Sequence, residues 1–324
     1  MPGDRLDVET RVPHGDTDAR TASGTGTGRA ESRRSLGRAL VVEARPKQWV
    51  KNLLVFAAPG AAGVVDQPTA FFQTLAAFGC FCLASGGTYY LNDAADVKAD
   101  RLHPTKRFRP IAAGEIPLGL ARVIGATAIV AAVAAAVAVN WHLAVVVGSY
   151  VLITTAYSTW LKHVAVVDVV GVAAGFVLRS IAGGSAVDVP ISNWFFIVAS
   201  FGSLFMVVGK RRAESDEMGV DAATFRPTLG QYPREYLTHL QTVASSVVLV
   251  GYCLWAFEKA AESGGGVPWF QLSIVPFALA IFRYALLVDT GHGGAPEDVV
   301  LADRALLVFA LVWAALFAAG VYLT

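Results

Sequence analysis

Four polar side chains at the end of a long apolar segment are the clearest candidates for chemistry in this sequence. Asn92, Asp96 and Asp100 follow one another at intervals of four residues, and Asp93 joins them at spacings of three and seven. Because residues three and four apart are neighbours on a helix surface, all four would share one face. Carboxylates on one face repel one another unless a cation lies among them, and hard oxygen ligands favour Mg²⁺, Mn²⁺ or Ca²⁺. The spacing predicts a metal site formed by these four side chains, with the three aspartates as the catalytic groups.

The nature of such a site depends on what else fills the coordination shell of the metal. Mg²⁺ typically takes one or two protein carboxylates and completes its shell with water and substrate phosphate. The alternative interpretation is a plain solvated helix end that is neutralised by Lys98 and Arg101. Carboxylates at the end of a membrane helix usually mark function, which favours the metal site.

A basic run follows the acidic face directly. The sequence HPTKRFRP, residues 103–110, places Lys106, Arg107 and Arg109 next to the carboxylates. Arginine offers a two-pronged fork to phosphate and lysine a point charge, so these residues are candidates for binding a substrate with more negative charge than Mg²⁺ neutralises. An anchor at the lipid headgroups explains any single one of the three equally well.

Other candidate substrate-binding residues lie where apolar segments begin or end. They stand at the start of the first segment and at the ends of the fourth and sixth: Lys51, Asn52, Tyr157, Lys162, Lys210, Arg211 and Glu214. Asp168 and Arg179 lie inside the fifth segment, eleven residues apart. Ionised groups in a membrane helix are costly and usually face a cavity or a partner. We expect Asp168 about two turns from the cytoplasmic end, within reach of the site, and Arg179 near the outer end, where it would extend to the interface.

The composition defines the class of protein. The chain has 324 residues, of which 55% are hydrophobic and 16% charged, which excludes an ordinary soluble enzyme. A membrane-spanning helix needs about 20 mostly apolar residues. We therefore expect an all-α integral membrane protein with about nine transmembrane helices, near 52–66, 70–91, 118–139, 142–161, 164–183, 192–210, 241–258, 268–288 and 304–323. The first segment is the weakest because it is short and contains Pro59.

Lysine and arginine gather in alternate connections, and this asymmetry sets the orientation of a membrane protein. It predicts a multi-pass protein of the plasma (inner) membrane, with the N-terminus and a polar, cytoplasm-facing cavity on the basic side and the C-terminus outside. Residues 1–38 are polar and are predicted to form a disordered cytoplasmic tail, followed by a single transmembrane catalytic domain at 39–324. The net charge of +1 argues against a nucleic-acid partner. The oligomeric state stays open, a homo-oligomer included.

Together these segments resemble the UbiA superfamily of intramembrane prenyltransferases. The pattern Asn-Asp-x-x-Asp-x-x-x-Asp at Asn92–Asp100 is similar to the signature of that family. The second aspartate-rich segment of the family is replaced here by GKRRAESDEMG, residues 209–219. The stretches RPKQWVKNLLVFAAP, YLNDAADVKADRLHPTKRFRPIAAG and FGSLFMVVGKRRAE are more similar to one branch, the actinobacterial phosphoribosyltransferases that act on polyprenyl phosphate in cell-wall arabinan synthesis.

This resemblance implies a UbiA-like bundle that transfers 5-phosphoribosyl from phosphoribosyl diphosphate to a polyprenyl (decaprenyl) phosphate, with Mg²⁺ as cofactor and diphosphate as the leaving group. It implies that the phosphate charge is held by a set drawn from Lys51, Lys106, Arg107, Lys162, Lys210 and Arg211. One alternative is UbiA-type aromatic prenyl transfer, which the basic segment at 209–219 disfavours. Another is a membrane transporter, which the lack of a visible two-fold repeat disfavours.

Overall fold

The computed structural model describes residues 34–218, 228–262, 266–291 and 296–323. Within these ranges the regular secondary structure is entirely helical, which confirms the all-α class. Residues 1–33 of the predicted tail lie outside the described residues. Helix α1 (Leu36–Glu43) begins inside the range that was predicted for the tail.

Eight helices in the described part of the chain are long and apolar enough to cross a membrane. They are α3 (Pro68–Ala95), α5 (Leu118–Val139), α6 (Trp141–Thr159), α7 (Val167–Ala186), α8 (Asn193–Met218), α10 (Arg234–Glu262), α11 (Trp269–Asp289) and α13 (Arg304–Tyr322). Large apolar side chains on their outer faces, such as Val130, Leu152 and Leu311, are more than half exposed. Apolar surface of this kind suits contact with lipid. The multi-pass membrane class predicted from the sequence is confirmed.

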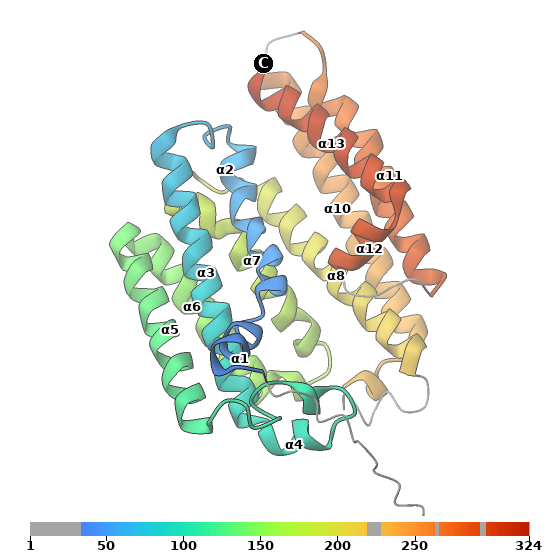
Figure 1. The fold of residues 1–324 in the computed structure, drawn as a ribbon. Helices are drawn as coiled ribbons and strands as arrows, with labels where there is room; N and C mark the ends of the chain where they lie inside the picture. Colours follow the sequence, from blue (N-terminus) through green and yellow to red (C-terminus); the bar gives the residue numbers. More distant parts are fainter. Residues whose placement is uncertain (1–33, 219–227, 263–265, 292–295, 324) are drawn as a thin grey trace, which may run out of the picture. The chain divides into compact units, whose positions relative to one another are not determined.

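The first predicted span has a different form from the other eight. Instead of one long helix at 52–66, the chain forms a 3₁₀-helix, η1 (Pro46–Phe56), followed by the short helix α2 (Ala57–Ala61). A 3₁₀-helix rises about 2.0 Å per residue and an α-helix about 1.5 Å, so the two together cover about 30 Å, the thickness of the hydrocarbon core. In Figure 1 this blue stretch runs beside α3, from α1 to the opposite end of that helix. A crossing of this kind is too irregular to count as a long helix.

The short elements gather around the polar connections. They are α4 (Val97–Leu102), η2 (Lys106–Phe108), η3 (Leu161–His163), η5 (Leu229–Gln231) and α12 (Pro296–Ala302). Figure 1 shows α4 at the end of the helical bundle where α3 and α8 finish and where α7 and α10 begin. The segment α2 and the last turns of α13 lie at the other end. The antiparallel course of the helices thus brings several charged connections to one end.

The close approach of η1 to α7 rests on one glycine. A Cβ atom on Gly183 of α7 would lie 1.8 Å from the carbonyl oxygen of Val55 and 2.8 Å from Pro59 Cδ. Only glycine permits this approach, and small residues commonly serve this purpose at helix interfaces in membranes. Gly183 therefore sets how closely η1 can lie against α7.

Gly183→Ala is expected to destabilise the protein, because the new methyl group must displace the backbone of Val55 rather than a mobile side chain. Overpacking typically costs about 1–3 kcal/mol, so the thermal unfolding temperature in detergent should fall by several degrees. Gly148→Ala in α6 is the matched control, since nothing lies within 4 Å of its Cβ position. The control should be unchanged or slightly more stable. Equal shifts for the two variants would contradict the contact assigned to Gly183.

Candidate active site

The acidic residues at the end of α3 converge on a single arginine. Helix α3 ends at Ala95 and α4 begins at Val97, so the helix is interrupted inside the predicted metal signature. Arg109 Nη1 lies 3.0 Å from Asp93 Oδ1 and 2.8 Å from Asp100 Oδ2. The two aspartates are 1% and 3% exposed. One guanidinium therefore bridges two buried carboxylates and offsets part of their charge.

A second arginine reaches Asp93 from the connection before η1. Arg45 donates a hydrogen bond to Asp93 Oδ2, and its guanidinium lies 4.6 Å from the centroid of the Tyr89 ring. The backbone of Arg45 has a φ of 53° and a ψ of 59°, a left-handed conformation that is uncommon outside glycine. Strained residues of this kind cluster at functional sites. Sequence reasoning missed Arg45, because a basic residue before the first span is usually an interfacial anchor.

Asp96 lies at the break between α3 and α4 and stays accessible. Its Oδ2 atom is 3.7 Å from Lys162 Nζ, and the two side chains are 38% and 30% exposed. Lys162 belongs to η3, between α6 and α7, so the pair joins two distant parts of the chain. Asn92 is half-buried on the last turns of α3, and its carbonyl oxygen accepts a hydrogen bond from the Asp96 N–H.

The basic side chains of the loop after α4 lie partly in the site and partly on the surface. Arg109 enters the carboxylate cluster, whereas the Arg107 guanidinium lies over the ring of Phe108, 4.8 Å from its centroid, on an exposed side chain. Lys106 is half-buried in η2, and its backbone N–H donates to His103 Nδ1. The three basic residues that the sequence presents as equivalent thus occupy three different environments.

Two further predicted residues have contacts away from the carboxylates of α3. Lys51 Nζ lies 2.6 Å from Gln48 Oε1, one turn earlier in η1. Tyr157, at the end of α6, packs against α7 so closely that a Cβ on Gly171 would lie 3.3 Å from its ring. The roles of these two residues toward a substrate stay predictions.

Glu43, the last residue of α1, adds a further carboxyl group that the sequence did not reveal. It is 1% exposed and lies beside Asp93, and neither of its oxygens makes a hydrogen bond of good geometry to the described residues. Burial, followed by the proximity of Asp93, raises the pKa of Glu43 to about 8. Glu43 is therefore largely protonated at neutral pH. The charges around it then balance, because three aspartates face the three cations Arg45, Arg109 and Lys162.

A second polar group surrounds Asp168. This residue is fully buried in the first turn of α7, rather than about two turns inside the helix as predicted. Its carboxylate accepts hydrogen bonds from the Tyr232 hydroxyl and, at 3.1 Å, from the Thr228 hydroxyl. Arg211 Nε lies 3.5 Å from Asp168 Oδ2, and Arg211 Nη1 lies 2.9 Å from Glu214 Oε2.

The predicted residues at the end of α8 therefore join Asp168 in one group. Lys210 Nζ lies 3.8 Å from Glu214 Oε1 at its exposed edge. The backbone is strained where α7 begins, since Val166 has a φ of 68°, and its N–H donates to the Tyr232 hydroxyl. Tyr232 was missed from the sequence because 64 residues separate it from Asp168, and no local pattern marks the pair.

Arg179 lies deep in the bundle instead of extending to the interface as predicted. It is 7% exposed, and its Nε donates a 2.8 Å hydrogen bond to Asn52 Oδ1 of η1. Its Nη1 donates to the Gly175 carbonyl and its Nη2 to the Tyr150 hydroxyl, both at 2.8 Å. Asn52 and Arg179, predicted as separate site residues, thus form one contact between η1 and α7.

The side chains at the site determine whether it can bind a divalent metal ion. In the described ranges, no three Asp, Glu, His or Cys side chains are placed to hold one ion. The aspartates of the signature bind arginine and lysine instead. Mg²⁺ needs only one or two protein carboxylates when a substrate phosphate fills its shell. The oxygens of Asp93, Asp96 and Asp100 fit that requirement once the basic side chains release them.

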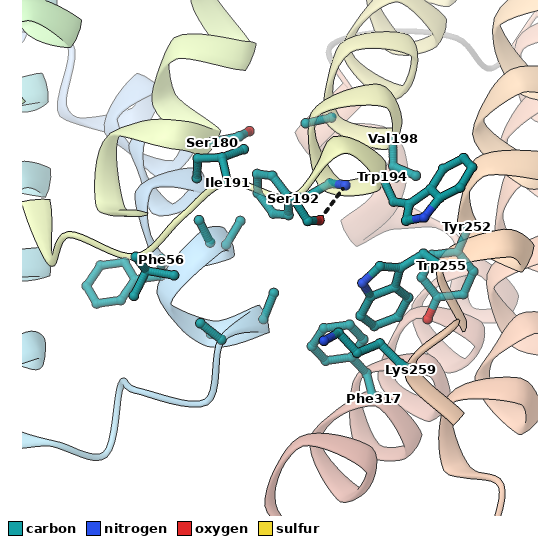
Figure 2. A pocket seen from close by; sticks show the side chains of 18 of the residues that line it. Phe56, Ser180, Ile191, Ser192, Trp194, Val198, Tyr252, Trp255, Lys259 and Phe317 are labelled. Atoms are coloured by element: carbon teal, nitrogen blue, oxygen red, sulfur yellow. Dashed lines mark hydrogen bonds between the residues drawn. The ribbon is translucent and has the colours of Figure 1, made fainter. Parts of the chain in front are cut away.

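An apolar pocket of about 820 Å³ lies near α2, at the end of the bundle away from α4. Figure 2 shows Trp194 of α8 and Trp255 of α10 near Phe317 of α13, with Phe56 across the pocket from them. Aromatic and aliphatic side chains dominate its lining, and Ser180 of α7 contributes a hydroxyl. Concave apolar space with a few polar groups is typical of a binding site for an apolar ligand.

The fold and the signature define the class of this protein: it belongs to the UbiA prenyltransferase family, whose model matches residues 53–302. The chain is 43% identical over 299 residues to the decaprenyl-phosphate phosphoribosyltransferase of Corynebacterium glutamicum, a match that covers 90% of this chain and 89% of the relative. It is 45% identical over 281 residues to the protein of the same name from Mycobacterium tuberculosis, with 86% and 92% covered.

Solved structures with the same fold have more distant sequences. A UbiA homolog from Archaeoglobus fulgidus, bound to GPP and Mg²⁺, superposes with a TM-score of 0.66 at 17% identity and covers 88% of this chain and 98% of its own. A digeranylgeranylglyceryl phosphate synthase structure gives a TM-score of 0.64 at 15% identity, with 89% and 99% covered. At these identities the likeness establishes the fold.

Glu43→Gln is expected to flatten the dependence of stability on pH. The pKa of Glu43 is about 8 in the folded protein and has an ordinary value of 4.5, so the unfolded chain releases this proton first. The wild-type protein should therefore lose stability as pH rises from about 5 to about 8, and the variant should lose less. Thermal unfolding of the metal-free proteins across this range measures the difference. Parallel curves for the two proteins would refute a raised pKa at Glu43.

Tyr232→Phe is expected to lower stability, because Asp168 loses a buried hydrogen-bond donor and the Val166 N–H loses its acceptor. Leaving buried polar groups unpaired costs about 1–3 kcal/mol. Tyr236→Phe is the control, since its ring stacks on that of Tyr232 with centroids 6.0 Å apart but its side chain is partly exposed. Chemical or thermal unfolding should separate the two variants. A control that is destabilised as much as Tyr232→Phe would assign the effect to ring packing instead.

Proposed function

We propose that this protein transfers the 5-phosphoribosyl group of phosphoribosyl diphosphate to a polyprenyl phosphate and releases diphosphate. The observation that carries the proposal is the buried bridge in which Arg109 joins Asp93 and Asp100, with Arg45 on the other oxygen of Asp93. It supplies carboxylates for a metal and guanidinium groups for a diphosphate at one place. The identities of 43% and 45% to decaprenyl-phosphate phosphoribosyltransferases support the choice of donor and of a decaprenyl acceptor.

Donor binding would exchange partners within the cluster. The diphosphate takes the guanidinium groups of Arg45 and Arg109, which offer two-pronged hydrogen bonds to phosphate oxygens. The released carboxylates of Asp93, Asp96 and Asp100 are then free to hold Mg²⁺, which supplies charge neutralisation for the departing diphosphate when bound. Mn²⁺ has the same ligand preference. Every buried charge has a partner both before and after this exchange, so no step leaves an isolated ion in the bundle.

The transfer forms a bond between a phosphate oxygen of the acceptor and C1 of the ribose. The bond from C1 to the diphosphate oxygen breaks, and the diphosphate leaves with the electron pair. A phosphate monoester has a second pKa near 6 and is already largely dianionic at pH 7, so the acceptor needs no general base. Positive charge develops on the sugar ring in such transfers, and the aspartates at the end of α3 would stabilise it.

The remaining phosphate charge would be held by the basic residues around the cluster. These are Lys51, Lys106, Arg107, Lys162, Lys210 and Arg211, with Glu214 and Tyr157 shaping their surroundings. The segment at the end of α8 favours this proposal over aromatic prenyl transfer, because Arg211 engages both Asp168 and Glu214 there. This segment places Lys210 and Arg211 where the second aspartate-rich segment of the family would supply further metal ligands.

The polyprenyl chain would stay in apolar surroundings while its phosphate reaches the site. The pocket near α2, lined by Trp194, Trp255 and Phe317, offers such surroundings within the bundle. The water-soluble donor would enter at the end where α4 and the basic connections lie. The positive-inside rule supports the proposal that this end faces the cytoplasm, with the N-terminus inside and the C-terminus outside. The proposed location is the plasma membrane.

The test is a transfer assay with purified full-length protein, radiolabelled phosphoribosyl diphosphate, decaprenyl phosphate and Mg²⁺. Label should pass into the organic phase and should stay in water when EDTA is added. Asp96→Asn should reduce the rate by about 10–100-fold, because it removes an accessible carboxylate without breaking the buried bridge. Asp66→Asn, an exposed aspartate just before α3, is the control and should keep full activity.

Two results would overturn the proposal. One is the absence of transfer by folded wild-type protein, with product formed instead from an allylic diphosphate and an aromatic acid. The other is full activity in EDTA, which would remove the role given to the carboxylates.

A further inference from the structure

Arg179 is a buried cation whose hydrogen-bond partners are all neutral. It donates to the side chain of Asn52, the carbonyl of Gly175 and the hydroxyl of Tyr150. No carboxylate among the described residues forms an ion pair with it. Two other arginines are buried in the described ranges, and both have a counter-ion, because Arg211 pairs with Asp168 and Arg212 with Asp289. Arg179 therefore stands out as a charge without a counter-ion.

Around these three partners, Arg179 is surrounded mainly by aromatic rings, with Tyr89 and the Cys82 thiol as further groups that interact with it. Its guanidinium lies 4.6 Å from the ring centroid of Tyr150 and 5.8 Å from those of Phe81 and Phe176. A guanidinium has five N–H donors, and three hydrogen bonds leave two of them available. An ionised group in such a place is costly, and in a membrane protein it usually marks a ligand path.

Arg179 lies between the two candidate binding regions. On one side, Tyr89 of α3 is close enough to interact electrostatically with Arg179 and also with Arg45 and Asp93 of the acidic cluster. On the other side, the next residue of α7, Ser180, lines the apolar pocket, as Figure 2 shows. The guanidinium is thus placed where a polar headgroup would meet an apolar chain.

We propose that Arg179 binds the phosphate group of the polyprenyl phosphate acceptor. The inference rests on the proposed function for the identity of the acceptor. A phosphate supplies the missing negative charge and accepts the two available N–H groups as a two-pronged pair. Asn52 and Tyr150 act as positioning residues, because they hold the guanidinium plane from η1 and α6.

The geometry of the transfer favours the acceptor over the 5-phosphate of the donor, which has the same chemistry. Attack on C1 from the face opposite the leaving group places acceptor and diphosphate on opposite sides of the ribose. The diphosphate lies at Arg45 and Arg109, next to the water-accessible end of the bundle. The acceptor phosphate must then lie on the bilayer side, where its apolar chain continues into the pocket. Arg179 is the buried cation on that side, whereas Lys259 at the pocket lining pairs with Glu262.

A purely structural tie between η1, α6 and α7 is the competing role for Arg179. It predicts a loss of stability on substitution without any change in ligand preference. The two roles are separated by a pair of ligands that differ only in the phosphate group. Farnesyl phosphate and farnesol serve as this pair, because they share one apolar chain.

The experiment measures binding of both ligands to the full-length protein in nanodiscs, without donor, by intrinsic tryptophan fluorescence and thermal shift. Wild-type protein should prefer farnesyl phosphate over farnesol by at least about tenfold, the worth of a hydrogen bond to a charged group. Arg179→Gln should reduce this preference to about threefold or less. Arg179→Lys, which keeps the charge, should retain an intermediate preference even where the Gln variant folds poorly. Arg122→Gln removes an exposed arginine of α5 and should match the wild type.

Kinetics with decaprenyl phosphate then separate acceptor from donor. In Arg179→Lys the KM for decaprenyl phosphate should rise several-fold, while the KM for phosphoribosyl diphosphate stays within about twofold. A rise in the KM for phosphoribosyl diphosphate alone would overturn the inference, because it would show that Arg179 binds the 5-phosphate of the donor. An unchanged preference for farnesyl phosphate in a folded Gln variant would overturn it in favour of the structural tie. Wild-type protein that shows the Arg179-dependent preference but no transfer would uphold the phosphate site and reject the donor.

Discussion

The buried ion pairs of Asp93 and Asp100 with Arg109 and Arg45 impose the main constraint on this bundle. Two carboxylates with 1% and 3% exposure are tolerated at a membrane helix end only while cations accompany them, since breaking a buried pair leaves an uncompensated charge. This requirement explains the break between α3 and α4, which lets both aspartates reach one guanidinium. It also explains the left-handed backbone of Arg45, which directs that side chain from the start of η1 back to α3.

The irregular first crossing follows from the same constraint. Arg45 fixes the start of this crossing through its bond to Asp93, and the hydrogen bond from Arg179 to Asn52 fixes its middle. The crossing can pack closely against α7 because Gly183 has no side chain. A 3₁₀-helix has poorer hydrogen bonds than an α-helix and is seldom long. The eleven residues of η1 are therefore held by tertiary contacts rather than by their own propensity. One mobile or displaced contact here would disturb both the acidic cluster and the deep guanidinium.

The sequence predicts those features that depend on local pattern. Eight long apolar runs become eight helices, and the spacing of Asp93, Asp96 and Asp100 marks the end of α3 as polar and functional. It does not predict that the helix breaks at Asp96, because hydropathy and spacing are the same for a continuous helix. Glu43 and Tyr232 could not be predicted for another reason. Their roles depend on burial beside Asp93 and Asp168, which lie about 50 to 64 positions away in the sequence. Arg179 was recognised as an ion within a span, yet its depth depends on packing that no periodicity encodes.

Charged and apolar side chains are concentrated at opposite ends of the bundle. At one end, three cations balance three aspartates, while Glu43, with a pKa of about 8, is largely protonated and adds little charge at neutral pH. Near the other end, an aromatic pocket of about 820 Å³ has one lysine in its lining, Lys259, which pairs with Glu262. A charge-balanced cluster can exchange its internal partners for a metal and an anion that arrive together, since the net charge of the buried site then changes little. A lone metal ion or a lone diphosphate would leave charges unmatched in a medium that solvates them poorly. The same physics that permits these ion pairs in a membrane therefore favours joint binding of cation and diphosphate over binding of either one alone.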